Sequence, residues 1–77
     1  MSKYPYRQDR EEIKALLQQF DNLKAGQSNS FIEEDSFERI IDYFDEKEQL
    51  NRALEAAEYG TEQYPYSSML LLKKADI

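Results

Sequence analysis

The stretch FERIIDYFDEKEQLNRALEAAEYGTEQYP, residues 37–65, decides the fold of this 77-residue chain. In its first half, large apolar residues recur at i, i+3, i+4 and i+7, which places them on one side of an α-helix. They are Phe37, Ile40, Ile41 and Phe44. The second half repeats the spacing with smaller residues, at Leu50, Ala53, Leu54, Ala57 and, as an extension of the same face, Gly60. Pro65 closes this second pattern because proline cannot continue a helix and favours extended geometry in the residue before it.

These two patterns predict a helical hairpin. A helix from about Asp35 to Glu46 and another from about Gln49 to Gln63 are joined by a short polar link, so they must lie antiparallel against each other. Residue sizes indicate how the helices meet. The second helix presents a stripe of small residues that lets another backbone come close, while two rings of the first helix, Phe37 and Phe44, fill the groove. The stripe consists of Ala53, Ala57 and Gly60.

A small-against-large seam of this kind resembles the tetratricopeptide repeat (TPR), a family with a helix-turn-helix unit of about 34 residues. The residues that match its pattern, in order, are Phe37 at the first aromatic, Ile40 at the leucine, Phe44 at the tyrosine, Ala53 at the alanine, Gly60 at a small position and Pro65 at the closing proline. Two positions depart from the family, since Ile41 replaces a glycine and Ala57 replaces a phenylalanine. This exchange either conserves the volume of the core or changes the crossing angle of the helices.

The fold that the resemblance implies is all-α, with about four helices in antiparallel helix-turn-helix repeats that stack as a superhelix. Residues 1–33 are then a lead-in, an amphipathic helix and a linker; residues 34–67 are one TPR-like hairpin; residues 68–77 are the first helix of a truncated second repeat, with Leu71 at the aromatic position and Ala75 at the small one. Because the apolar pattern is still running at Ile77, we interpret the chain as the amino-terminal fragment of a longer repeat protein. The alternative is a complete four-helix protein whose last helix docks on the others.

Local signals place the ends of the flanking helices. Asp9 with Glu12 has the form of a capping box and predicts that the first helix begins there. Its apolar face consists of Ile13, Leu16, Leu17, Phe20 and Leu23. Gly26 supplies the left-handed residue that commonly ends a helix. At the other end of the chain, Ser67 or Ser68 is expected to cap the final helix.

The segment between the first helix and the hairpin is polar until Phe31 and Ile32, which we interpret as an apolar plug beneath the next helix. Ser30 with Glu33 also has the form of a capping box, so the hairpin's first helix begins either as early as Phe31 or, as we favour, near Asp35.

Composition excludes several kinds of site and segment. The chain contains no cysteine and no histidine, so it has neither a disulfide framework nor the commonest zinc ligand. No apolar run is long enough to span a membrane, and residues 1–10 lack the apolar core of a signal peptide. We therefore expect a soluble, cytoplasmic protein without a membrane partner.

Charge is distributed unevenly. Residues 27–63 carry eleven acidic and three basic side chains, whereas the flanks 1–26 and 64–77 each have a net charge of +1, which gives −6 for the whole chain. Phosphate contacts need clustered Lys and Arg, so nucleic acid is not expected as a partner. A basic partner fits the hairpin better.

Asp42, Asp45 and Glu46 share a helix face at i, i+3 and i+4, a spacing able to hold a divalent cation or to pair carboxylates for acid–base chemistry. Their polar sequence surroundings favour a solvated charged face instead. The chain has no EF-hand loop, phosphate loop, nucleophile elbow or Cys/His array. We therefore expect no enzyme activity, no metal and no cofactor.

The resemblance gives the acidic helix face a more specific role, because the first helix of each TPR unit lines a concave groove that receives a peptide. The corresponding residues are Asp35, Glu38, Arg39, Asp42, Asp45 and Glu46, with Tyr43 and Tyr66 as candidate apolar contacts. Family members that bind a terminal carboxylate use Lys, Asn and Arg on this face, and Glu38 and Asp42 depart from that pattern.

The sequence therefore predicts a non-catalytic protein–protein interaction scaffold whose acidic face receives a basic or amphipathic peptide. One alternative is that this face is only solvated and that the groove lies in repeats outside this sequence. Another is a small helical oligomerisation domain that forms a homodimer through residues Met69–Ile77.

Overall fold

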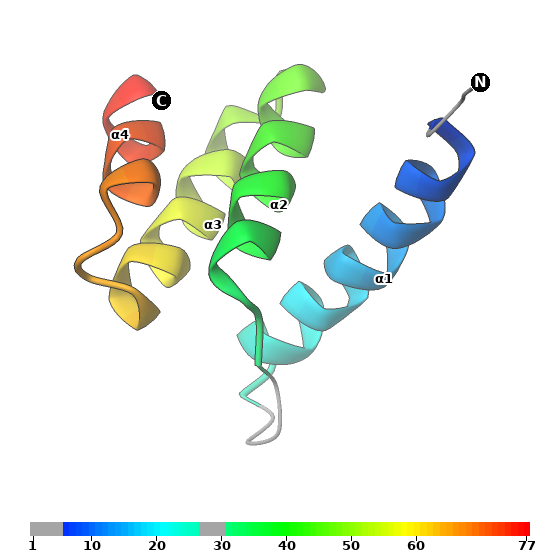
Figure 1. Cartoon of the computed structure of the whole chain (residues 1–77), viewed down its shortest axis with the longest axis horizontal. Helices are drawn as coiled ribbons and strands as arrows, with labels where there is room; N and C mark the ends of the chain where they lie inside the picture. Colours follow the sequence, from blue (N-terminus) through cyan, green and yellow to red (C-terminus); the bar gives the residue numbers. More distant parts are fainter. Residues whose placement is uncertain (1–5, 27–30) are drawn as a thin grey trace. The chain divides into compact units, whose positions relative to one another are not determined.

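The computed structural model describes the backbone of residues 6–26 and 31–77, and the side chains of residues 11–26 and 31–77. Within these ranges the chain forms four α-helices and no strand (Figure 1), which confirms the predicted all-α class. The helices are α1 (Tyr6–Lys24), α2 (Glu34–Glu46), α3 (Leu50–Gln63) and α4 (Ser68–Asp76). The chain divides into two compact units, Met1–Phe31 and Ile32–Ile77. The described helices include none with the length and apolar character that a membrane crossing requires.

The first unit contains α1. The helix begins at Tyr6, so the predicted start at Asp9 is wrong by three residues. Asp9 instead lies in the first turn of the helix. The predicted end is confirmed, because Gly26 has a φ of +84° and its N–H donates to the carbonyl of Leu23 over 3.0 Å.

The second unit is organised around α2 and α3, which lie side by side and run in opposite directions (Figure 1). The predicted inner face of α2 is confirmed, since all four of its apolar residues are buried: Phe37, Ile40, Ile41 and Phe44. The helix begins at Glu34, one residue before the favoured start, and its N-cap Glu33 makes no side-chain cap bond. Ser30, the alternative cap, lies outside the described residues.

The apolar plug is formed by one residue of the expected pair. Ile32 is fully buried, as predicted, whereas Phe31 is 66 % exposed. The Tyr64 hydroxyl donates a hydrogen bond of 2.7 Å to the carbonyl of Ile32, and the Tyr64 ring meets Phe37 edge-on with ring centroids 6.1 Å apart. The turn after α3 thus fixes the segment that leads into α2.

Burial raises the pKa of the Tyr64 hydroxyl above its ordinary value of 10.0, and the negative charges of Glu33, Glu34 and Asp35 raise it further. A raised pKa means that the folded state favours the protonated form. The resulting stabilisation is complete below pH 10.0 and is lost as the pH rises through the folded-state pKa.

We therefore expect Tyr64→Phe to cost about 1 kcal/mol of unfolding free energy at neutral pH, the net value of a typical hydrogen bond. Above pH 10 the stability of the variant should fall less steeply than that of the wild type. Urea denaturation at several pH values measures both effects. Tyr66→Phe is the matched control, because Tyr66 is 94 % exposed; an equal change in this variant would contradict the assignment.

The α2–α3 turn has the hydrogen bonds of a Schellman motif. The N–H of Gln49 donates to the carbonyl of Phe44 over 2.8 Å, and the N–H of Glu48 donates to that of Asp45 over 3.0 Å. Glu48 holds the left-handed position of the motif, with a φ of +59°, where glycine is the usual residue. A side chain at that position is sterically unfavourable.

We expect Glu48→Gly to raise the free energy of unfolding by roughly 0.5–1 kcal/mol, since the steric relief exceeds the extra chain entropy that glycine brings to the unfolded state. Glu48→Ala removes the same charge but keeps a Cβ, and should give no gain. Urea denaturation compares the two. Equal stabilisation by both variants would assign the effect to charge instead of backbone geometry.

The buried face of α3 consists only of Ala53, Ala56, Ala57 and Gly60. Leu50 and Leu54, predicted on that face, are 50 % and 37 % exposed, so this part of the prediction is wrong. The helix is rotated about its axis because α2 already supplies the large side chains of the core. A Cβ added to Gly60 would lie 3.1 Å from Cγ of Phe37 and 3.3 Å from Cδ1 of Leu70. The small residues of α3 therefore allow its neighbouring helices to pack closely against it, as the sequence indicated.

The passage from α3 to α4 follows the predicted signals. Pro65 lies in a turn after α3, which the Ser67 N–H closes by donating to the carbonyl of Tyr64 over 3.1 Å. Ser67 then caps α4, and its Oγ accepts from the N–H of Leu70 over 3.2 Å. Leu70 is the buried residue of α4. Leu71 and Ala75, which the resemblance matches to the aromatic and small positions of a repeat, are exposed.

Candidate functional site

The candidate site is the outward face of α2. Its six predicted residues lie within about 120° of the helix circumference, at 100° per residue, on the side opposite the buried face. Asp35, Asp42, Asp45 and Glu46 are exposed, while Glu38 and Arg39 are half-buried. Five carboxylates and one guanidinium thus share one face of a helix, as the spacing predicted. The apolar residues on the other side hold this helix in place.

The structure connects this face to α4. Nζ of Lys73 lies 2.8 Å from Oδ1 of Asp42, which places an ion pair between two helices at the middle of the acidic face. Surface ion pairs of this kind contribute about 0–1 kcal/mol to the free energy of unfolding. The contact therefore holds α4 against α2 only weakly. Its main effect on the site is to neutralise one of the five carboxylates. No local pattern predicts this pairing, because the two residues are 31 positions apart.

The two candidate aromatic contacts, Tyr43 and Tyr66, differ in how far they are exposed. Tyr43 is half-buried, its ring packs edge-on against Phe44, and Nζ of Lys47 lies 5.7 Å from its centroid. Tyr66 is 94 % exposed in the turn that leads to α4. Tyr66 and Glu34 line a common shallow depression with residues 63–65 and Ser67, so Tyr66 lies near the amino-terminal end of α2. Tyr66 is thus exposed beside Glu34, at the start of α2, while Tyr43 is already covered in part.

The carboxylates show no arrangement suited to a metal. Among the described residues, no group of three or more acidic side chains converges closely enough to hold an ion. This includes Asp42, Asp45 and Glu46, which share a face but do not form a cage.

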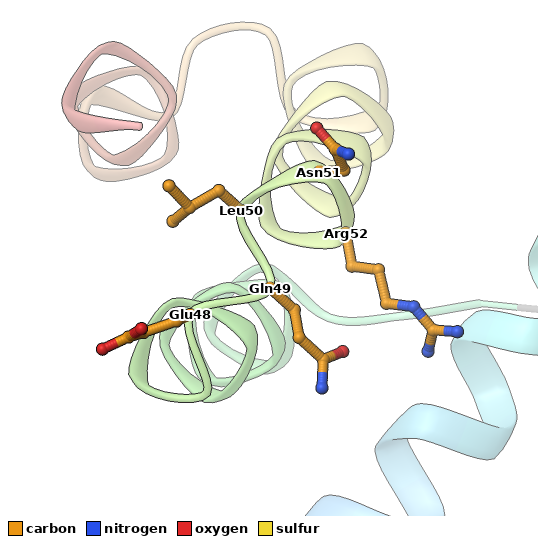
Figure 2. Close-up of a pocket in the computed structure, with 5 residues that line it drawn as sticks. All are labelled: Glu48, Gln49, Leu50, Asn51 and Arg52. Carbon is orange, nitrogen blue, oxygen red and sulfur yellow. The ribbon is translucent and has the colours of Figure 1, made fainter.

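The α2–α3 turn forms a second shallow depression, lined by residues 48–52 (Figure 2). Glu48 and Leu50 point to one side of the turn, and Gln49 and Arg52 point to the other. The guanidinium carbon of Arg52 lies 5.8 Å from the Phe44 ring centroid, a cation–π contact that covers the end of the core. The depression is open and contains no group with evident chemistry.

α3 carries a further acidic surface, which is not among the site residues predicted from the sequence. Glu55, Glu58 and Glu62 line a third depression together with Tyr59. Their spacing of i, i+3 and i+7 was visible in the sequence and predicts a common helix face.

Comparison of the chain with models of protein families, with curated proteins and with solved structures gives no match.

Proposed function

We propose that this protein is a non-catalytic, TPR-type interaction scaffold of the cytoplasm, and that the outward face of α2 receives a basic or amphipathic peptide. The TPR part of the proposal is supported by the seam between α2 and α3. Phe37 is packed against Gly60, and the other contributions of α3 to the core come from alanines. Pro65 follows the hairpin at the position of the family's closing proline.

The observation that supports peptide binding is the concentration of carboxylates on one helix face that is held rigidly by a buried opposite face. Carboxylates grouped on one face of a chain of net charge −6 produce a negative potential that attracts cationic segments and raises their association rate. A bound peptide would place Lys or Arg near Glu38 and Asp45 and would compete with Lys73 for Asp42. The exposed Tyr66 ring offers an apolar or cation–π contact near one end of the face.

The test is an NMR titration of the isotope-labelled protein with a Lys/Arg-rich peptide, in which the amide chemical shifts are monitored. Shifts at Glu38, Asp42 and Asp45 are expected, with affinity that falls as salt is added, because the attraction is electrostatic. A titration that leaves these three amides unmoved would remove the proposed site.

A pair of double variants sharpens this test. Glu38→Gln with Asp45→Asn removes two charges from the α2 face and should weaken binding about fivefold, given about 0.5 kcal/mol per exposed pair. Glu58→Gln with Glu62→Gln removes the same charge from α3 and should change affinity less than about twofold. If the α3 variant binds as weakly as the α2 variant, net charge and not this face determines the affinity.

A further inference from the structure

Lys73 of α4 places a cation on the acidic face of α2. Its Nζ lies 2.8 Å from Oδ1 of Asp42, and these two atoms form both a hydrogen bond and an ion pair. An ammonium group is the kind of group that the proposed function assigns to the partner. The chain therefore already supplies one carboxylate of the binding face with an internal ligand.

The packing of α4 determines where this lysine lies. The helix contacts both α2 and α3, and its Leu70 is fully buried. Lys73 follows Leu70 by three residues, so the two side chains lie on the same side of α4. The Lys73 side chain is accordingly only 22 % exposed, whereas the adjacent Lys74 is exposed. Because its aliphatic stem is largely covered, Lys73 loses less side-chain entropy on pairing than a fully exposed lysine would.

The other partner of the ion pair remains accessible. The Asp42 side chain is 56 % exposed, so a cation from solution can reach its carboxylate. An ion pair at a surface of this kind is weak, with an equilibrium constant for formation of roughly 1–5. The Lys73 ammonium therefore leaves Asp42 often enough for another cation to replace it.

We propose that the Lys73–Asp42 ion pair is an autoinhibitory contact, through which α4 competes with the peptide for the acidic face of α2. This inference rests on the proposed function, because it concerns the regulation of the same face. A cation of the peptide can use Asp42 only while Lys73 is released, which holds for roughly a half to a sixth of the molecules. The contact therefore lowers the apparent affinity for the peptide about two- to sixfold. By linkage, the bound peptide weakens the Lys73–Asp42 contact by the same factor.

Three variants of the α4 lysines test the proposal, with the affinity for a peptide of alternating Lys and Arg measured at low salt. Lys73→Gln should bind this peptide about two- to sixfold more tightly than the wild type. Lys74→Gln is the matched control: it removes the same charge from the adjacent exposed position and should change the affinity less than about 1.5-fold. Lys73→Arg keeps the cation and should bind no more tightly than the wild type.

A second background shows whether the effect depends on Asp42. In a chain that carries Asp42→Asn, the further change Lys73→Gln should leave the peptide affinity unaltered, because the contact that it removes is already absent. During a titration of the wild type, the side-chain NMR signals of Lys73 should shift and those of Lys74 should not. Circular dichroism shows whether each variant remains helical. Lys73→Met, which keeps the aliphatic stem, is the substitute if Lys73→Gln does not fold.

The outcomes distinguish this inference from the proposed function. Equal affinities of the folded Lys73→Gln and Lys74→Gln variants, or the same gain in the Asp42→Asn background, overturn the autoinhibitory contact and leave the proposed function standing. Absence of peptide binding in both the wild type and Lys73→Gln overturns the proposed function and this inference together. Binding by Lys73→Gln without binding by the wild type supports both.

Discussion

Phe37→Ala is expected to unfold most of the unit formed by residues 32–77 at room temperature. Phe37 is fully buried, lies against Gly60 and packs edge-on against the Tyr64 ring. Removal of a buried phenylalanine ring costs about 3–5 kcal/mol. A compact unit of this size has a total stability of about 2–7 kcal/mol, at roughly 0.05–0.15 kcal/mol per residue. The single substitution therefore removes most or all of the stability, and urea denaturation followed by circular dichroism measures the loss.

Phe31→Ala is the matched control for this prediction, because it deletes the same ring from a side chain that is 66 % exposed. We expect it to change the unfolding free energy by less than about 0.5 kcal/mol, the usual range for surface substitutions. If both variants lost the same stability, the effect would not come from the α2–α3 seam.

Gly60→Leu should destabilise the same unit by about 2 kcal/mol or more. A Cβ alone would lie 3.1 Å from Cγ of Phe37, and the rest of a leucine side chain has to displace that ring or Leu70. Overpacking of a core typically costs about 1–3 kcal/mol and occasionally more. The higher helix propensity of leucine relative to glycine offsets only about 1 kcal/mol of this cost. The measurement is the same urea denaturation.

Glu58→Leu introduces the same side chain at an exposed position of the same helix and serves as the control. Its effect should stay within about 0.5 kcal/mol. Stability equal to wild type in Gly60→Leu would show that α2 and α3 are not closely packed at this point, and the proposed TPR-type packing would then lose its main support.

A double variant tests the contact itself. Gly60→Ala adds a methyl group where Phe37 is closest, and Phe37→Leu removes volume at the same place. The two changes together should cost less than the sum of the single changes, with a coupling of about 0.5–3 kcal/mol for side chains in contact. Additive effects on the free energy of unfolding would show that the two side chains do not interact.

The stability of this seam matters for the proposed binding face. The acidic face of α2 points outward because Phe37, Ile40 and Phe44 fix the opposite side of the helix. On the neighbouring helix, α3 presents alanines and a glycine to the core and leaves Leu50 and Leu54 exposed at its side. This packing therefore determines where the peptide is expected to bind.

Local signals predicted much of this structure. The buried face of α2, the ends of α1 and α3 near Gly26 and Pro65, and the cap of α4 at Ser67 all depend on residues within a few positions of one another. Such signals act within one turn of helix and can be recognised without a tertiary contact. The six residues proposed for the α2 face share one side for the same reason.

The largest failure, on α3, has a tertiary cause. Leu50 and Leu54 satisfy helical spacing as well as Ala56 and Gly60 do, so periodicity does not show how α3 is rotated about its axis. That rotation is set by the large side chains of α2, which are distant in sequence and leave room only for small partners. The early start of α1 at Tyr6 was missed because the Asp9 signal fits a first turn as well as a cap.

The sequence by itself predicted that residues 35–63 form two antiparallel helices, that one buries large residues and the other small ones, and that the outward side of the first is acidic. These properties follow from spacing, size and charge along a short length of chain. The tertiary structure alone decided that Lys73 neutralises Asp42, that Tyr64 fixes Ile32, and that four leucines of α3 and α4 remain exposed. Each of these depends on how helices pack in three dimensions, which residue order along one helix does not specify.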